Sequence, residues 1–247
     1  MSETAAPQMP PFYTRPVAID SRRHAGHGLK PGTYAFARET VYVHLNAVEF
    51  AVASKTYPIV FTDSDEPAPV AILGLRQAQN LFVDAEGYWT PFTYIPAYVR
   101  RYPFIFAGDP QAKQLALCID EASDWVVQDG GSALFADGKR TKLVEDALEL
   151  CTSFHREATV TQAFCKTLKE KDLLVQRRAD VTLNSGERSS LSGFLSIDEE
   201  KFNALPDDVV LDWRKRGLLA AIYAQLMSAS NWQVLVNRTT ASDQAKA

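Results

Sequence analysis

The sequence predicts an α+β fold. The N-terminal half should hold short, mainly antiparallel strands with short helices, and the C-terminal half a long helix, a β-hairpin and a terminal helix or helix pair. Apolar β-branched runs alternate with turn residues before residue 128, and apolar residues recur at three- and four-residue spacing after residue 142. We expect one domain over residues 17–236, with a β-rich half at about 17–128 and a helical half at about 139–236. A flexible arm (1–16) precedes it and a flexible tail (237–247) follows it.

The first half predicts a short helix followed by a hairpin. Asn46 can cap a helix over residues 46–55, which ends before Pro58 because the residue preceding a proline avoids helical backbone angles. Two apolar runs at 59–61 and 70–73 flank a polar turn, so they predict a hairpin with a buried centre.

Three further elements are predicted before residue 128. Residues 81–83 and 88–90 flank a turn in which Gly87 can adopt positive φ, which indicates a second hairpin. Residues 96–101 open on a proline, which suits the first position of one or two helical turns. Larger and smaller apolar residues alternate over 115–119, which is the period of a strand with one buried face.

The second half opens with the clearest helical pattern of the chain. Apolar residues follow helical spacing from 143 to 168, and a break near 159–161 is left open. Alternating apolar residues at 181–183 and 191–197 then flank Asn184-Ser185-Gly186, which predicts a hairpin.

A helix or helix pair is predicted from Pro206 to about Ser230. Proline suits the first helical position, and the aspartates that follow it complement the free amides of the first turn. Gly217 indicates a break between two helices.

The composition excludes several classes of protein. Apolar residues make up 46% of the chain and charged residues 23%, which is the balance of a globular protein and not of a disordered one. A formal net charge of −4 disfavours binding to phosphate backbones or anionic lipids, so we expect no nucleic-acid partner. Cys118, Cys151 and Cys165 form an odd set without CxxC spacing, which indicates a reducing compartment.

Two patterns bear on location. The N-terminal residues lack the basic start and the apolar stretch of about 7–15 residues that a secretory signal requires. The longest apolar region, residues 218–227, is about half of the roughly 20 residues that a membrane crossing needs. We therefore expect a cytoplasmic protein with no membrane span, which reaches the cell surface only by an export route other than Sec.

His24 and His27 are the candidate metal ligands, since two imidazoles at this spacing can converge on one ion. A third ligand at a defined spacing is missing, and Gly26 and Gly28 indicate irregular backbone, so we expect a polar loop and no metal. The sequence also lacks a nucleophile elbow and a phosphate-binding glycine loop. We therefore predict no catalytic residue and no bound cofactor.

Asp120 and Glu121 are the best candidates for paired carboxylates. They follow the predicted strand at 115–119, and strand ends often present polar groups to clefts. Adjacent strand residues point to opposite faces, however, so a turn-forming role is the more ordinary interpretation.

Residues 88–102 carry an unusual density of rings, prolines and basic residues. Rings provide rigid contact area and arginine provides a planar set of donors, so this segment is a candidate contact surface for a protein partner. The residues that we assign to it are Trp89, Tyr94, Tyr98, Arg100, Arg101 and Tyr102. The alternative is that the rings line the core between the two halves, with the arginines solvated or paired.

Several of these segments, with others along the chain, resemble the SapC family in their order and spacing over about residues 17–232. The motifs are Arg22-Arg23-His24, Tyr57-Pro58-Ile59-Val60-Phe61, Leu73-Gly74-Leu75, Asn80-Leu81-Phe82-Val83-Asp84, Tyr94-Ile95-Pro96-Ala97-Tyr98-Val99-Arg100-Arg101-Tyr102-Pro103-Phe104, Leu117-Cys118-Ile119-Asp120-Glu121, Thr161-Gln162-Ala163-Phe164-Cys165, Leu191-Ser192-Gly193-Phe194 and Asn203-Ala204-Leu205-Pro206-Asp207. The family takes its name from association with a bacterial surface layer, so the resemblance implies an accessory role.

Two hypotheses of function follow. The first is a non-enzymatic interaction protein, accessory to a bacterial surface-layer or uptake system, with a protein partner at the aromatic segment. The alternative is an enzyme or small-ligand binder with a cleft between the β-rich and helical halves, whose pocket draws on His24, Arg101, Asp120 and Glu121.

Overall fold

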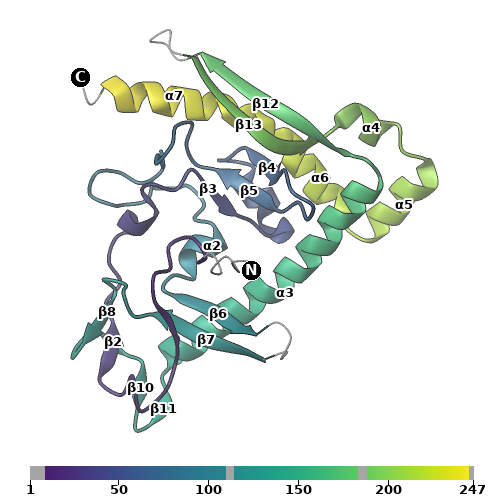
Figure 1. Cartoon of the computed structure of the whole chain (residues 1–247). Coiled ribbons are helices and arrows are strands. Elements are labelled where there is room, and N and C mark those ends of the chain that lie inside the picture. The colour runs from purple at the N-terminus through teal and green to yellow at the C-terminus, as the bar shows by residue number, and fades with distance from the viewer. Residues whose placement is uncertain (1–8, 110–113, 183–187, 245–247) are drawn as a thin grey trace, which may run out of the picture. The chain divides into compact units, whose positions relative to one another are not determined.

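The computed structural model describes residues 9–109, 114–182 and 188–244, and Figure 1 shows their elements in chain order. The chain divides into two compact units. Unit 1 contains residues 1–33 and 100–153, and unit 2 contains residues 34–99 and 154–247. Each unit combines segments from both halves of the sequence, whereas the sequence predicted two halves that follow each other along the chain. The antiparallel strands and helices confirm the predicted α+β class.

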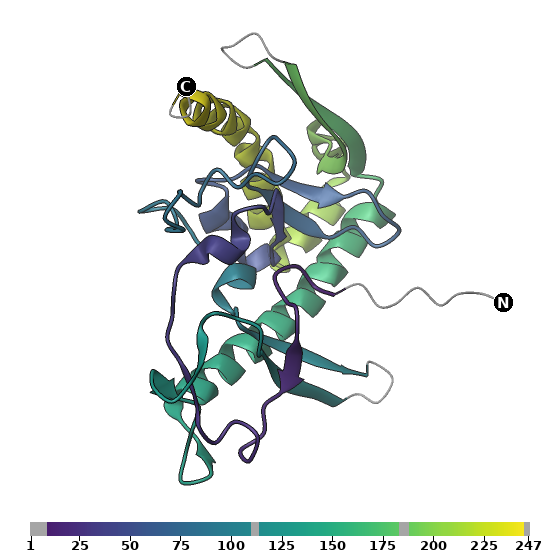
Figure 2. The same cartoon turned by 60° about the vertical axis from the view of Figure 1, so that its left-hand side comes forward.

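Unit 1 is built on the antiparallel sheet β1-β7-β6, whose strands are Pro16–Ala18, Gln114–Asp120 and Phe104–Asp109. β6 and β7 lie side by side in both views (Figure 1, Figure 2). The strand predicted at 115–119 is confirmed as the body of β7. Leu117 and Ile119 are buried on one face of β7, whereas Leu115 on the same face is exposed near the start of the strand, and Cys118 on the other face is also buried.

A second sheet and the first turns of a long helix complete unit 1. The sheet has the order β8-β2-β9, with strands Val126–Gln128, His27–Leu29 and Ser132–Ala133. A small hairpin follows it and consists of β10 (Phe135–Ala136) and β11 (Lys139–Arg140). The core of unit 1 consists of Leu29, Phe104, Leu117, Ile119, Leu134, Phe135, Val144 and Cys151. Its last two residues belong to helix α3, so the start of α3 closes this core.

Unit 2 contains a five-stranded antiparallel sheet in the order β12-β13-β4-β5-β3, with strands Leu174–Thr182, Arg188–Ile197, Ile59–Thr62, Pro69–Ile72 and Tyr42–His44. The hairpin predicted at 59–61 and 70–73 is confirmed as β4 and β5. The later hairpin is β12 and β13, which pairs with β4 at Phe194 and Leu195. The turn predicted at 184–186 lies outside the described residues.

Short helices connect the strands of unit 2. The helix predicted at 46–55 is confirmed as η2 (Ala47–Glu49) and α1 (Phe50–Ala53), which follow a short helix η1 (Tyr34–Ala37). The backbone amide of Asn46 donates to Glu49 Oε2 at 2.9 Å, which gives a partner to a backbone N–H at the helix start. The predicted turns at 96–101 are α2 (Ala97–Arg100).

Helix α3 (Lys142–Glu170) is continuous over 29 residues, so the break that we left open near 159–161 does not occur. Thr161 lies within that region, and its Oγ1 donates to Glu157 O at 2.7 Å and accepts from Ala47 N at 2.8 Å. The boundary between the two units falls within this helix, after Ser153.

Helices end the chain in the order α4, α5, α6, η3 and α7, with bounds Glu199–Asn203, Asp207–Lys215, Leu218–Met227, Ser228–Ser230 and Asn231–Gln244. The helix start predicted at Pro206 is confirmed, and Gly217, with φ of 75°, separates α5 from α6. Residues 237–244 of the expected flexible tail belong to α7, because Leu235, Val236 and Thr239 are buried. None of the helices in the described ranges combines the length and the apolar character that a membrane crossing requires.

The second predicted hairpin is reduced to a single antiparallel bridge between Val83 and Trp89. The turn has the expected geometry, with Gly87 at φ of 87°. Pairing stops soon afterwards because Pro91 has no amide hydrogen and Phe92 takes a left-handed backbone at φ of 62°.

Candidate functional site

Glu121 is the centre of an ionic cluster in unit 1. Arg23 donates to both carboxylate oxygens of Glu121, at 2.6 and 2.9 Å, and Arg15 Nε lies 3.5 Å from Oε2. His24 Nε2 lies 3.3 Å from Oε1. Only 12% of the Glu121 side chain is exposed, so the carboxylate is largely enclosed by its partners. Two segments that the sequence singled out, at 22–24 and at 117–121, thus meet here.

The hydrogen bonds from Arg23 hold the pKa of Glu121 below its ordinary value, and the nearby charge of Arg15 adds to this effect. The same contact raises the pKa of Arg23. Glu121 is therefore ionised at neutral pH, and the arrangement favours a structural ion pair over a proton donor.

His24 is fully buried beside this carboxylate. Its Nδ1 lies 3.1 Å from the backbone nitrogen and oxygen of Asp20, so either tautomer has a partner there. The His24 and His27 rings meet edge to face at 5.3 Å. Within the described parts of the chain, no group of three or more His, Cys, Asp or Glu side chains could hold a metal ion.

Asp120 has a different set of partners from Glu121. It is buried, and its carboxylate accepts from the backbone amides of Thr14, Arg15 and Ala122 at 2.9, 2.8 and 3.1 Å. These bonds tie residues 14–15 to the end of β7. A carboxylate with three amide donors is suited to holding backbone in place.

The four residues of the alternative pocket therefore do not share one role. Glu121 lines a hollow of about 330 Å³ with Arg15, Arg23 and His27. Arg101 is half-buried, with its guanidinium carbon 5.9 Å from the centroid of the Tyr13 ring.

The six residues assigned to the aromatic contact surface are mostly internal. Trp89, Tyr98 and Tyr102 are buried, Tyr94 and Arg101 are half-buried, and Arg100 is exposed. The first three along the chain belong to unit 2 and the last three to unit 1. Burial of the rings favours a structural role for them, and a contact role stays a prediction.

Trp89 stabilises the surrounding loop through hydrogen bonds in the interior of unit 2. Its Nε1 donates to the Tyr57 hydroxyl at 3.2 Å, and this hydroxyl donates to the carbonyl of Tyr94. The Tyr57 and Phe82 rings meet edge to face at 4.7 Å, and the Arg238 guanidinium lies 4.4 Å from the centroid of Phe82. Burial raises the pKa of Tyr57, so its hydroxyl stays protonated and keeps the hydrogen that it donates to the Tyr94 carbonyl.

The exposed rings of this region are two that the sequence reasoning missed, Tyr88 and Phe92. Tyr88 is 62% exposed, Phe92 is fully exposed, and both lie on residues 84–92, which we call the aromatic loop. Tyr88 precedes the inward-pointing Trp89, and neighbouring residues of extended backbone point to opposite sides. That alternation was the signal in the sequence for Tyr88, whereas the conformation of Phe92 had no such signal.

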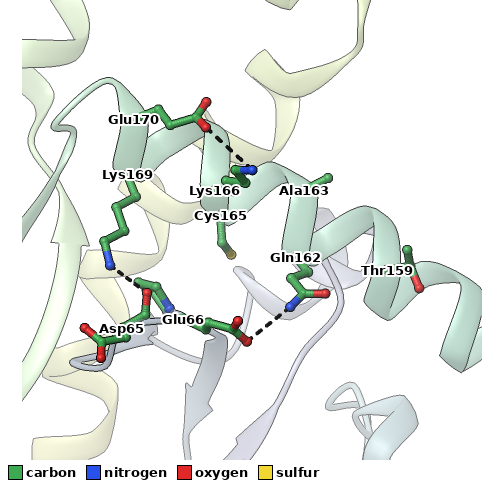
Figure 3. Close-up of a pocket in the computed structure, with 10 residues that line it drawn as sticks. Asp65, Glu66, Thr159, Gln162, Ala163, Cys165, Lys166, Lys169 and Glu170 are labelled. Carbon is green, nitrogen blue, oxygen red and sulfur yellow. Dashed lines mark hydrogen bonds and ion pairs between the residues drawn. The ribbon is translucent and has the colours of Figure 1, made fainter. Parts of the chain in front are cut away.

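A groove of about 720 Å³ lies between α3 and the β4–β5 turn of unit 2. Figure 3 shows Gln162 and Lys169 of α3 reaching the turn, where they donate to Glu66 Oε2 at 3.3 Å and to Asp65 O at 2.6 Å. Cys165 points toward the same groove, but burial raises the pKa of its thiol to about 12, so the reactive thiolate is scarce at neutral pH. Gln162, Lys166 and Lys169 thus already have partners within the groove, in Glu66, Glu170 and the Asp65 carbonyl.

Comparison with known proteins adds one relation. No curated protein and no solved structure matches the chain. Residues 19–235 match a family model described as SapC.

Proposed function

This chain belongs to the SapC family, and we propose that it is a non-enzymatic accessory protein that contacts a protein partner through the aromatic loop. The observation that carries the proposal is Phe92, which combines full exposure with a left-handed backbone. We further propose that the partner belongs to a bacterial surface-layer or uptake system, as the name of the family suggests.

Phe92 carries two energetic costs in the free protein. Its ring leaves apolar area in water, and a non-glycine residue in the left-handed region costs on the order of 1–3 kcal/mol. Neither cost is offset by burial of the ring within the described structure. A ring held outward in this way supports a role as an anchor that fills a pocket on another protein.

The charges of the loop favour one kind of partner. Asp84 and Glu86 are exposed on the same loop as Tyr88 and Phe92. Such a surface complements an apolar pocket with a basic rim, whereas an anionic lipid surface or a nucleic acid would be repelled.

Phe92→Gly is the variant that tests the proposal. Glycine accepts positive φ without strain, so the variant should be as stable as the parent protein or more stable, by up to about 1 kcal/mol. Loss of the ring should abolish recovery of the partner from soluble and envelope fractions by the tagged protein. Recovery is measured by mass spectrometry and stability by thermal unfolding.

Tyr42→Ser is the matched control, because Tyr42 is a half-exposed ring of unit 2 on β3, outside the aromatic loop. We expect the parent protein and Tyr42→Ser to recover the same partners, and Phe92→Gly to lose them. Equal recovery by all three proteins would show that the aromatic loop is not the contact surface.

A further inference from the structure

A second hollow of unit 2, of about 400 Å³, is lined by residues of the β12–β13 hairpin, β4, α6, η3 and α7. The lining residues that matter here are Val60, Arg177, Arg178, Phe194, Gln225 and Trp232. The volume lies within the range of small-molecule sites. We propose that this hollow binds a small aromatic carboxylic acid that also carries a hydrogen-bond donor.

Gln225 supplies an acceptor for the donor of such a ligand. Its Nε2 donates to Ile59 O at 2.9 Å and to Ser196 Oγ at 3.0 Å, and the contact with a carbonyl fixes which end of the amide is nitrogen. The residue is only 2% exposed, and its Oε1 has no hydrogen-bond partner among the described residues. A buried acceptor without a donor is unfavourable, so a ligand hydroxyl or N–H that reaches it gains affinity.

Two aromatic rings form the wall on which a flat ligand can lie. Phe194 and Trp232 are stacked, with ring centroids 5.6 Å apart and an interplanar angle of 28°. Phe194 is buried, whereas Trp232 is half-buried, so part of the indole remains available. A planar ring gains both apolar burial and stacking there.

Arg177 and Arg178 supply the positive charge for a carboxylate. Arg177 pairs with Asp198 at 3.2 Å and Arg178 with Asp180 at 2.6 Å, and the two arginine side chains are 53% and 64% exposed. Exposed ion pairs contribute little, so these guanidinium groups can change partner at low cost. The guanidinium fork matches a carboxylate.

A β-bulge in β13 lies opposite the two arginines of β12. Arg177 is opposite Phe194 and Ala179 is opposite Leu191, so β13 carries one more residue than β12 between these pairs. Gly193 lies in this bulge with φ of 79°. A bulge bends the strand that carries the extra residue, and bulges are frequent beside binding sites.

The test uses 19F NMR of protein labelled with 5-fluorotryptophan. The chain has four tryptophans, and Trp232→Phe identifies the resonance of Trp232. The probe is 4-hydroxyphenylacetate, which carries a ring, a hydroxyl donor and a carboxylate. We expect the Trp232 resonance to shift saturably while those of Trp89, Trp125 and Trp213 stay in place.

Matched probes and variants separate the parts of the proposal. Phenylacetate lacks the donor and should bind at least about fivefold more weakly, because it leaves Gln225 Oε1 unpaired. Arg178→Gln should weaken the binding of 4-hydroxyphenylacetate by at least about fivefold, whereas Arg216→Gln, which removes a similarly exposed arginine directly after α5, should not. Phe92→Gly should leave binding unchanged, so failure here is distinct from failure of the aromatic loop.

Three outcomes would overturn the proposal. They are an unmoved Trp232 resonance at about 10 mM probe, equal affinity for phenylacetate, and equal loss of affinity in Arg178→Gln and Arg216→Gln.

Discussion

Glu121 illustrates how one carboxylate organises its surroundings at the scale of single residues. Arg23 and Arg15 come from before β2, whereas Glu121 follows β7, so their contact joins segments about 100 residues apart. His24 is enclosed behind the same carboxylate. The sequence named His24 and Glu121 as parts of one pocket and placed Arg23 in a family motif, but it did not predict that Arg15 and Arg23 neutralise Glu121.

The pKa of Glu121 predicts a dependence of stability on pH. Arg23 lowers the folded-state pKa below the ordinary 4.5, so the ion pair contributes its full stability above that value and loses it as pH falls through the folded pKa. Glu121→Gln should therefore unfold at a lower temperature than the parent protein near pH 7. This gap, the difference between the two unfolding temperatures, should close on acidification below about pH 4. Thermal melts from pH 7 to 3 measure it.

The same melts in an Arg23→Gln background provide the control. Removal of the partner should abolish most of the pH dependence of the gap, because Arg23 is the main cause of the lowered pKa. A gap of constant size across the whole pH range would contradict the ion pair.

Trp89 and Phe92 show that residue type alone does not decide burial. Both belong to one aromatic segment, yet Trp89 is buried and bonded to Tyr57 while Phe92 is fully exposed. The side on which each ring lies depends on the turn at Gly87 and on the left-handed backbone at Phe92. The density of rings in the sequence therefore identified the aromatic segment, but it did not identify which of its rings are exposed.

Among the elements of unit 1, strand β2 lies in close backbone contact with the segment at Gly130. A Cβ at Gly28 would lie 1.9 Å from the carbonyl oxygen of Gly130, which is too short for any side chain. At Gly26 the nearest atom to a Cβ would be an Asp129 carboxylate oxygen at 3.8 Å, which is an ordinary contact. The two glycines, two residues apart, therefore have different requirements.

Gly28→Ala should destabilise the protein by about 1–3 kcal/mol, since the β8-β2-β9 sheet must shift to admit the methyl group. Gly26→Ala is the matched control and should change stability by no more than about 0.5 kcal/mol. Denaturant unfolding measures both variants. Equal stability of the two variants would show that the sheet accommodates a side chain at Gly28 without strain.

Helix α3 shows how tertiary contacts override local preference. Thr159, Val160 and Thr161 are β-branched and suggested a break, because such residues lose side-chain freedom in a helix. The helix continues through them. Thr161 satisfies its hydroxyl within the helix and receives the Ala47 amide, which no local pattern predicts.

The division into two units raises the question of cooperativity for the whole molecule. The sequence predicted one domain over residues 17–236, and α3 contributes residues to both units. We expect the chain to unfold as one domain. Leu134→Ala, in the core of unit 1, should then cost about 2–5 kcal/mol and lower the amide protection of both units equally.

Hydrogen exchange read by mass spectrometry distinguishes the two cases, with Leu115→Ala, at an exposed position near the start of β7, as the control. Loss of protection confined to residues 9–33 and 100–153 would mean that unit 1 opens independently of unit 2.

The sequence by itself determined the class of the fold, the hairpin at β4 and β5, the starts of η2 and α5 and the membership of the SapC family. These features depend on periodicity, caps and turn residues, which act over a few positions. Only the tertiary structure decided which segments share a unit, which rings are exposed, and how Glu121 and Gln225 are surrounded. Those outcomes depend on contacts between segments far apart in the chain, which local spacing does not encode.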